Sequence, residues 1–188
     1  DIYYMATNPE VIGFDASATT DNLRLAITEW AKNRLEANES LTLYIMDHGK
    51  RNVIYIDEVN NERVTPDQLD DWLTEVEEAV PGVKVNVIIE ACYSGSFIDG
   101  ENTISKPNRV VITSSRPGWS AYASRFGAHF SDHFLTAMKQ GTGLLRSFEK
   151  AHQIVSISHP KQKPWLDANG NGIPNEDKDK DIAANRGF

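Results

Sequence analysis

The stretch that decides the fold is Val83-Lys84-Val85-Asn86-Val87-Ile88-Ile89-Glu90-Ala91-Cys92-Tyr93-Ser94-Gly95-Ser96. Six of its first nine residues are apolar and five of those are β-branched, which is typical of a strand at the centre of a parallel sheet. The run ends at Cys92, the only cysteine of the chain, and a small glycine-containing turn follows at once. The stretch therefore predicts a central strand with a thiol at its carboxyl end.

A second predicted strand, residues 41–47, ends in the same way in His48-Gly49. Active sites of open parallel sheets form at the carboxyl ends of the strands, so Cys92 and His48 can become neighbours. A nearby imidazole can supply the thiolate or deliver a proton to a leaving group. Gly49 lets a substrate carbonyl come close, and the amides of Gly49 and Cys92 can stabilise an oxyanion. This pattern predicts an enzyme with a thiol nucleophile.

Strand and helix signals alternate along the rest of the chain. Thr65-Pro66-Asp67-Gln68 is a strong helix start, because it combines a Thr cap, a Pro at the first helical position and a Gln that closes a capping box. The alternation predicts an α/β fold with helices on both faces of a mostly parallel sheet. Further strands are predicted for residues 2–5, 53–56 and 109–113, and further helices from Thr20 or Asp21, over residues 130–138 and over residues 144–155.

Composition limits the classes of function. The 188 residues carry a net charge of −8 and no basic stripe, which argues against nucleic acid as a partner. The apolar runs are too short to span a bilayer. From residue 161 the composition shifts to Pro, Gly, Asn and Asp. We therefore expect one domain over residues 1–160 and an Asp/Asn/Gly-rich tail over residues 161–188.

The tail begins like a calcium-binding loop, in which oxygen ligands alternate along the chain and a Gly stands at the sixth position. Lys178 occupies the twelfth position and cannot ligate a cation, so an acidic neighbour has to close the shell. The pattern predicts a structural Ca²⁺, no cofactor for catalysis, and an extracellular or cell-envelope setting; the alternative is a solvated acidic loop. The expected ligands are Asp167, Asn169, Asn171, the Ile173 carbonyl and Asp177, with Asp179 or Asp181 as alternatives for the last.

The motif Glu90-Ala91-Cys92-Tyr93-Ser94-Gly95-Ser96, with Asp47-His48-Gly49 upstream, resembles the legumain family of cysteine peptidases (family C13, clan CD). The resemblance covers most of the chain and implies a caspase-like three-layer α/β/α sandwich. It also implies a His48/Cys92 dyad, an oxyanion hole built from the Gly49 and Cys92 amides, and a substrate pocket between the 90–96 and 114–122 loops. The pocket residues would be Glu90, Ser114, Ser115 and Ser120.

Two departures from the family pattern carry expectations of their own. Ala128 stands where the family has an Asp in the pocket, so we expect a polar pocket with an altered preference for Asn before the cleaved bond. The Arg-bearing first strand of the fold is absent from this chain, so we expect an additional N-terminal segment or a second chain to complete the sheet. The resulting hypothesis is a cysteine endopeptidase acting on peptides or proteins. The alternatives are a transpeptidase or ligase of the same fold and a non-catalytic peptide-binding module.

Overall fold

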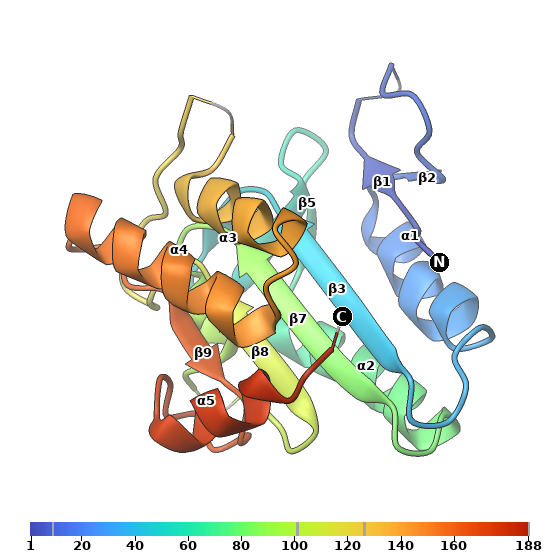
Figure 1. Ribbon diagram of the computed structural model, residues 1–188. Coiled ribbons are helices and arrows are strands. Elements are labelled where there is room, and N and C mark those ends of the chain that lie inside the picture. Colours follow the sequence, from blue (N-terminus) through green and yellow to red (C-terminus); the bar gives the residue numbers. More distant parts are fainter. Residues whose placement is uncertain (9, 101, 126, 188) are drawn as a thin grey trace.

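The computed structural model describes residues 1–8, 10–100, 102–125 and 127–187. The main sheet has four strands in the order β3-β7-β8-β9 (Figure 1). The strands β3 (Ser40–Met46), β7 (Lys84–Glu90) and β8 (Arg109–Thr113) are parallel, and β9 (Trp165–Asp167) runs antiparallel to β8. Every residue of β7 after Lys84 is buried. The prediction of a central buried strand is confirmed.

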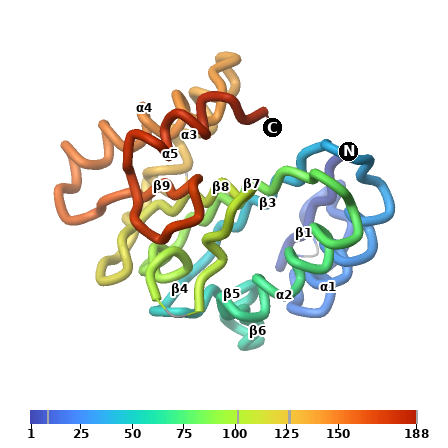
Figure 2. The backbone as a smooth tube through the Cα atoms, turned by 90° about the horizontal axis from the view of Figure 1, so that it is seen from below, coloured from blue at the N-terminus to red at the C-terminus, as the bar shows by residue number. Residues whose placement is uncertain are grey.

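Helices cover both faces of this sheet (Figure 2). One face carries α1 (Thr20–Leu25), which continues into the π-helix η1 (Ala26–Ala31), together with α2 (Pro66–Ala79). The other face carries α3 (His129–Lys139), α4 (Leu144–Ser158) and α5 (Asp177–Ala184). The fold is therefore the expected α/β sandwich.

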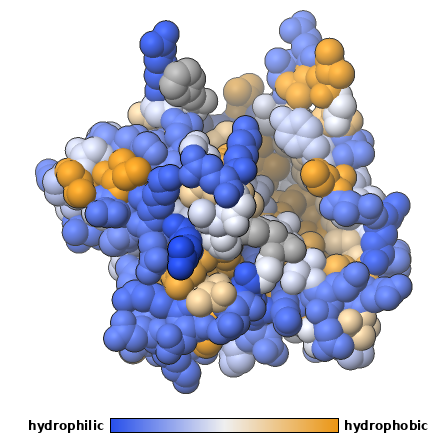
Figure 3. All heavy atoms as spheres, viewed as in Figure 1, coloured by the Kyte–Doolittle hydropathy of each residue, from blue (hydrophilic) through white to orange (hydrophobic). Residues whose placement is uncertain are grey.

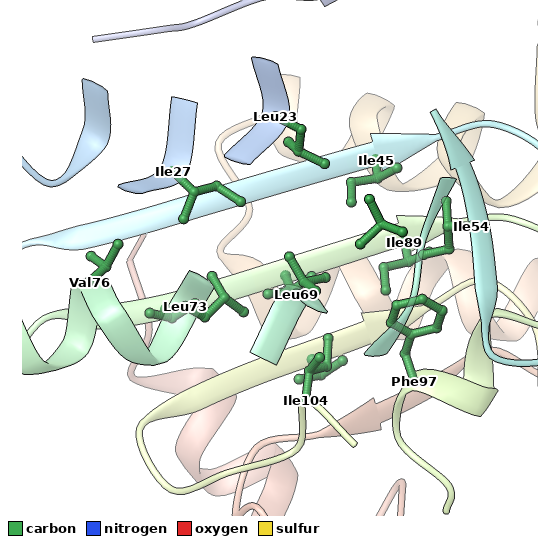
Figure 4. Close-up of a cluster of buried hydrophobic side chains, with 14 of the residues drawn as sticks. Leu23, Ile27, Ile45, Ile54, Leu69, Leu73, Val76, Ile89, Phe97 and Ile104 are labelled. Atoms are coloured by element: carbon green, nitrogen blue, oxygen red, sulfur yellow. The ribbon is translucent and has the colours of Figure 1, made fainter. Parts of the chain in front are cut away.

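Each face of the sheet has its own apolar core. Leu23 lies over Ile45 of β3 and Ile27 lies further along the same strand (Figure 4). Leu69 and Leu73 of α2 pack in the same core, which also contains Ile89. On the opposite face the core is formed by Ile88, Ile112, Phe130, Phe134 and Phe148, all of them buried. Because successive residues of a strand point to opposite faces, Ile88 and Ile89 serve different cores.

The helix starts agree with local capping chemistry. Thr65 and Gln68 form the predicted capping box at the start of α2, with Gln68 N donating to Thr65 Oγ1 and Thr65 N donating to Gln68 Oε1. The cap of α1 is Thr19, one residue before the predicted start, because its hydroxyl accepts from Asn22 N.

Two smaller sheets flank the main one. β4 (Gly49–Lys50), β5 (Val53–Asp57) and β6 (Glu62–Val64) form an antiparallel sheet directly after His48. β1 (Met5–Ala6) pairs in parallel with β2 (Ala16–Ser17). The strand predicted for residues 2–5 is therefore largely wrong: regular pairing begins at Met5, and before it Tyr4 is held by backbone and side-chain bonds to Asp15.

Residues 161–187 contribute to the main sheet and to a core. β9 pairs with β8, and Leu166, Ala168 and Ala183 are buried in the core under α3, α4 and α5. None of the described helices is long and apolar enough to cross a bilayer.

Candidate active site

The strand ends that carry Cys92 and His48 lie next to each other. β3 and β7 pair in register from Ser40 and Lys84 to Met46 and Glu90. The pairing extends one step further, because Asp47 N donates to the Glu90 carbonyl over 3.2 Å. The two chain segments therefore leave the sheet side by side, as their positions in the sequence predicted.

Gly49 is packed against the backbone that bears the thiol. A Cβ atom added at Gly49 would overlap the carbonyl oxygen of Cys92 and lie 3.0 Å from the Cβ of Ala91. Only glycine allows the backbones to approach this closely. His48 is thereby held between Asp47, which is bonded to Glu90, and Gly49, which touches Cys92.

The side chain of His48 points into solvent and is 73% exposed. Its Nε2 lies 3.9 Å from Glu58 Oε2, and its backbone N–H donates to Asp47 Oδ1 over 2.6 Å. Burial raises the pKa of Asp47, while the hydrogen bond from His48 opposes that shift. The structure brings the backbone segments of Cys92 and His48 together, and among the described residues no hydrogen bond joins their side chains.

The turn that bears the thiol has a strained backbone. Tyr93, directly after Cys92, has φ of 59° in the left-handed region, which is costly for a bulky side chain. The conformation is held because Tyr93 N donates to the Trp119 carbonyl over 2.8 Å, and Ser115 Oγ donates to the same oxygen over 2.5 Å. Cys92 itself is half-buried, with its Sγ 3.7 Å from the carbonyl of Ala121.

Glu90 is 2% exposed and forms one end of a polar network. Its Oε2 accepts from both the N–H (2.8 Å) and the Oγ (2.9 Å) of Ser131, and Tyr44 donates to that same Oγ. Its Oε1 has no hydrogen-bond partner among the described residues. Burial raises the pKa of Glu90, and the hydrogen bonds from the Ser131 hydroxyl and backbone N–H oppose that shift.

The serines predicted for the pocket occupy different environments. Ser114 and Ser115 are fully buried, and their hydroxyls bond to the backbone carbonyls of Ala91 and Trp119 respectively. Ser120 is exposed. The 114–122 loop does lie beside the thiol, because Trp119 and Ala121 contact Tyr93 and Cys92.

The predicted calcium loop is ordered by its own side chains. Asp167 accepts from the amides of Gly170 and Gly172, and the amide groups of Asn169 and Asn171 donate to Glu176. Ile173 donates its own N–H to Asn171 Oδ1 and has an exposed side chain.

The acidic residues that follow this loop differ in where their carboxylates lie. The Asp177 side chain is 98% exposed and pairs with Lys180, whereas buried Asp179 accepts from the amides of Ala168 and Asn169. No group of three or more His, Cys, Asp and Glu side chains among the described residues is arranged to hold a metal ion.

Sequence reasoning missed a cluster of aromatic and imidazole rings beside the 114–122 loop. The ring of His129 lies 5.0 Å from that of His133 and 4.6 Å from that of His159, and Tyr122 lies 4.3 Å from His159. The oxygen of Ser158 Oγ bonds to a ring nitrogen of both His129 and His159. These residues come from three separate segments, so no local spacing signals their proximity.

Two comparisons place the chain among known folds. It is similar to caspase-1 from Spodoptera frugiperda, with 16% identity, a TM-score of 0.61, and coverage of 84% of this chain and 72% of that one. It is also similar to a protein of known structure from Geobacter sulfurreducens, with 18% identity, a TM-score of 0.57, and coverage of 82% and 76% respectively. At these identities the likeness shows the fold.

The sequence itself matches a family model. No curated protein matches the chain. Residues 30–169, which include His48, Gly49, Glu90 and Cys92, match the model of the Peptidase C13 family. This match covers most of the chain and agrees with both the sandwich fold and the resemblance carried by the two strand ends. The chain belongs to the Peptidase C13 family.

Proposed function

We propose that this chain is a cysteine endopeptidase in which Cys92 is the nucleophile and His48 the acid–base group. The family and the caspase-like fold support a cysteine peptidase-type function in general. The observation that carries the specific assignment is the contact of Gly49 with the Cys92 carbonyl, since it sets the His48 segment directly against the thiol turn. The proposal requires the exposed His48 side chain to rotate toward Cys92 when substrate binds, as catalytic pairs are often loose before that step.

In the proposed reaction the Cys92 thiolate attacks the carbonyl carbon of a peptide bond. The carbon–nitrogen bond then breaks, and His48 delivers a proton to the leaving amine. Water, which loses a proton to the neutral imidazole, attacks the thioester and releases the acid and the thiol. A transpeptidase would differ only in the last step, where an amine replaces water.

Two backbone amides are available for the oxyanion. The carbonyl of His48, the residue before β4, accepts from Tyr55 N of β5, so by the alternation of antiparallel pairs the Gly49 N–H points away from β5. The amides of Ala91, Tyr93 and Ser94 all have acceptors, whereas that of Cys92 has none among the described residues. Free donors fixed beside the thiol are what a developing oxyanion requires.

The substrate pocket in this proposal lies between the 90–96 turn and the 114–122 loop. We propose that the Glu90 Oε1, which is buried and has no partner among the described residues, accepts from a polar side chain of the substrate, while exposed Ser120 lies on the neighbouring loop. Ala128, at the start of α3, contributes no carboxylate. We therefore propose a polar pocket whose preference for Asn is altered or relaxed.

The test is digestion of a peptide library, analysed by mass spectrometry, with and without an added amine nucleophile. We expect cleavage by the unmodified protein, loss of cleavage in Cys92→Ala and His48→Ala, and retention in the control His152→Ala, whose ring lies on α4 beside Phe148. Products joined to the amine would identify a transpeptidase. Full activity of Cys92→Ala, or the absence of any cleaved or joined product, would overturn the proposal and leave a peptide-binding module.

A further inference from the structure

Gln162 lies outside the thiol site, in the connection between α4 and β9, yet it is fully buried. Its Nε2 donates to the carbonyl of Ser114 over 2.9 Å, and its Oε1 accepts from the N–H of Tyr122 over 3.0 Å. One side-chain amide thus spans both ends of the 114–122 loop. A buried amide is tolerated because both of its ends are bonded.

The segment that Gln162 holds is the one that touches the thiol. Ala121, whose carbonyl lies 3.7 Å from Cys92 Sγ, is the residue before Tyr122. On the other side of Ala121, the Trp119 carbonyl accepts from Tyr93 in the strained turn. The position of the Ala121 carbonyl is therefore fixed between an anchor at Trp119 and an anchor at Tyr122.

Residues next to Gln162 in the sequence also contact the 114–122 loop. The Nζ of Lys161 lies 5.2 Å from the centroid of the Trp119 ring, whose other neighbour is the guanidinium of Arg116 at 4.6 Å. His159 packs its ring on Tyr122. Residues 159–162 therefore contact the 114–122 loop at several points. Among these four residues, only Gln162 forms hydrogen bonds with the loop backbone at both of the loop's ends.

We propose that Gln162 is a positioning residue for the thiol site: its amide ties Ser114 to Tyr122 and so holds the Ala121 carbonyl against Cys92. The inference rests on the proposed peptidase function for its kinetic consequence. Its structural part, in which the two hydrogen bonds of Gln162 hold the 114–122 loop in place, does not depend on that function. Small displacements of groups around a reacting centre are costly for rate, on the order of 100-fold for about 1 Å.

The test compares Gln162→Met, Gln162→Glu and the control Gln153→Met, which alters an exposed glutamine of α4. Met fills a similar volume but makes neither hydrogen bond. A Glu carboxylate repels the Ser114 carbonyl, whereas a protonated Glu can donate to it and still accept from Tyr122. Folding of each variant is checked first by circular dichroism at the assay temperature.

We expect kcat/KM of Gln162→Met to fall by about 10- to 100-fold at every pH. Gln162→Glu should show a similar loss at pH 8 and recover relative to the unmodified protein as the pH is lowered. A purely structural contribution would not produce this recovery in folded protein. A folded Gln162→Met with kcat/KM within about twofold of the control would overturn the inference.

Hydrogen–deuterium exchange of residues 119–125 separates this inference from the proposed function. We expect faster exchange at Tyr122 in Gln162→Met and no change in Gln153→Met, whether or not the protein cleaves peptides. If the unmodified protein is inactive, the proposed function fails while faster exchange still supports the tie. Unchanged exchange in Gln162→Met overturns the tie itself.

Discussion

A Cβ atom added to Gly49 would overlap the carbonyl oxygen of Cys92, so the two strand ends meet backbone to backbone. We expect Gly49→Ala to force the Cys92 carbonyl or the β4–β5 hairpin to move, at a cost of about 1–3 kcal/mol in the free energy of unfolding. Because the displaced groups include both proposed oxyanion donors, kcat/KM should fall by about 100-fold or more. Steady-state kinetics and chemical denaturation measure the two effects.

The matched control for this prediction is Gly187→Ala, outside the proposed site, where the Gly187 carbonyl accepts from Asn86 of β7. An added Cβ at Gly187 has nothing within 4 Å, and its backbone is not in the left-handed region. This variant should therefore keep both stability and activity. Equal kinetics for Gly49→Ala and Gly187→Ala would contradict a close contact at Gly49.

The second prediction concerns the outer edge of β3, whose backbone amides are not paired with another strand of the described chain. The odd-numbered residues of β3 bond to β7, as the pairs Asp47–Glu90 and Lys84–Glu39 show, so the amides of Thr42, Tyr44 and Met46 face away from the sheet. Natural proteins usually cover the unpaired N–H and C=O groups of an edge strand whose side chains are apolar on both faces. Figure 3 shows apolar residues gathered on the N-terminal segment and in the hollow beside it. We propose that a further segment or chain pairs with this edge.

Residue-resolved hydrogen exchange tests the open edge. In this chain alone, at low concentration, the amides of Thr42 and Tyr44 should exchange much faster than those of Leu43 and Ile45, which bond to β7. A completing segment should slow the first pair and leave the second pair unchanged. Equally slow exchange of all four amides in the isolated chain would show that the edge is already covered.

The parts of the fold that were predicted correctly depend on local signals. The apolar run of β7 and the capping box at Thr65 are each visible within a few residues, and the strand-end position of Cys92 and His48 follows from the topology they imply. For Arg109 the sequence predicts only the start of a strand. Arg109 is fully buried because all of its N–H groups find acceptors, mainly Asp70 and Glu77 of α2, and such distant pairing leaves no pattern in the sequence. Gln162 was missed for the same reason.

The cluster of His129, His133, His159 and Tyr122 rings beside the 114–122 loop predicts a pH dependence of stability. Burial lowers the pKa of His129, as do the positive charges of His159 and His133, while Asp132 opposes the shift. A histidine whose pKa is lower in the folded state stabilises that state when it is neutral, and the stabilisation is lost as the pH falls through the folded pKa. The stability of the folded chain should therefore fall as the pH drops through the lowered pKa of His129, which lies below the usual histidine value of about 6.5.

An NMR titration of the histidine rings measures this effect. We expect His129 to titrate below pH 6.5 and to shift upward in His159→Asn, because one neighbouring positive charge is removed. His152, whose pKa is lowered by burial and by Lys163 and Lys180, is the internal control and should not move. An unchanged His129 titration in His159→Asn would show that the rings are not electrostatically coupled.

The last prediction concerns calcium binding by the loop that follows β9. Asp167 and Asp179 are both fully buried, and within the described chain their hydrogen bonds come from backbone amides and none from Lys or Arg. Burial raises the pKa of Asp179, and the negative charge of Asp167 raises it further. A divalent cation would relieve this repulsion, and the side-chain oxygens of Asn169 and Asn171 and the Ile173 carbonyl are ligands of the kind that Ca²⁺ prefers. We therefore expect Ca²⁺ to raise the melting temperature.

Calorimetry with calcium and with a chelator tests this expectation, and two matched variants locate the closing ligand. Asp179→Asn should abolish the calcium-dependent shift, because its carboxylate lies in the loop. Asp177→Asn should retain the shift if the exposed Asp177 stays paired with Lys180, and should lose it if Asp177 turns inward to bind the ion. At saturating calcium, about 100 times the dissociation constant, the expected stabilisation is about 2.7 kcal/mol. A melting temperature that calcium does not change would leave a solvated acidic loop whose order comes from its own hydrogen bonds.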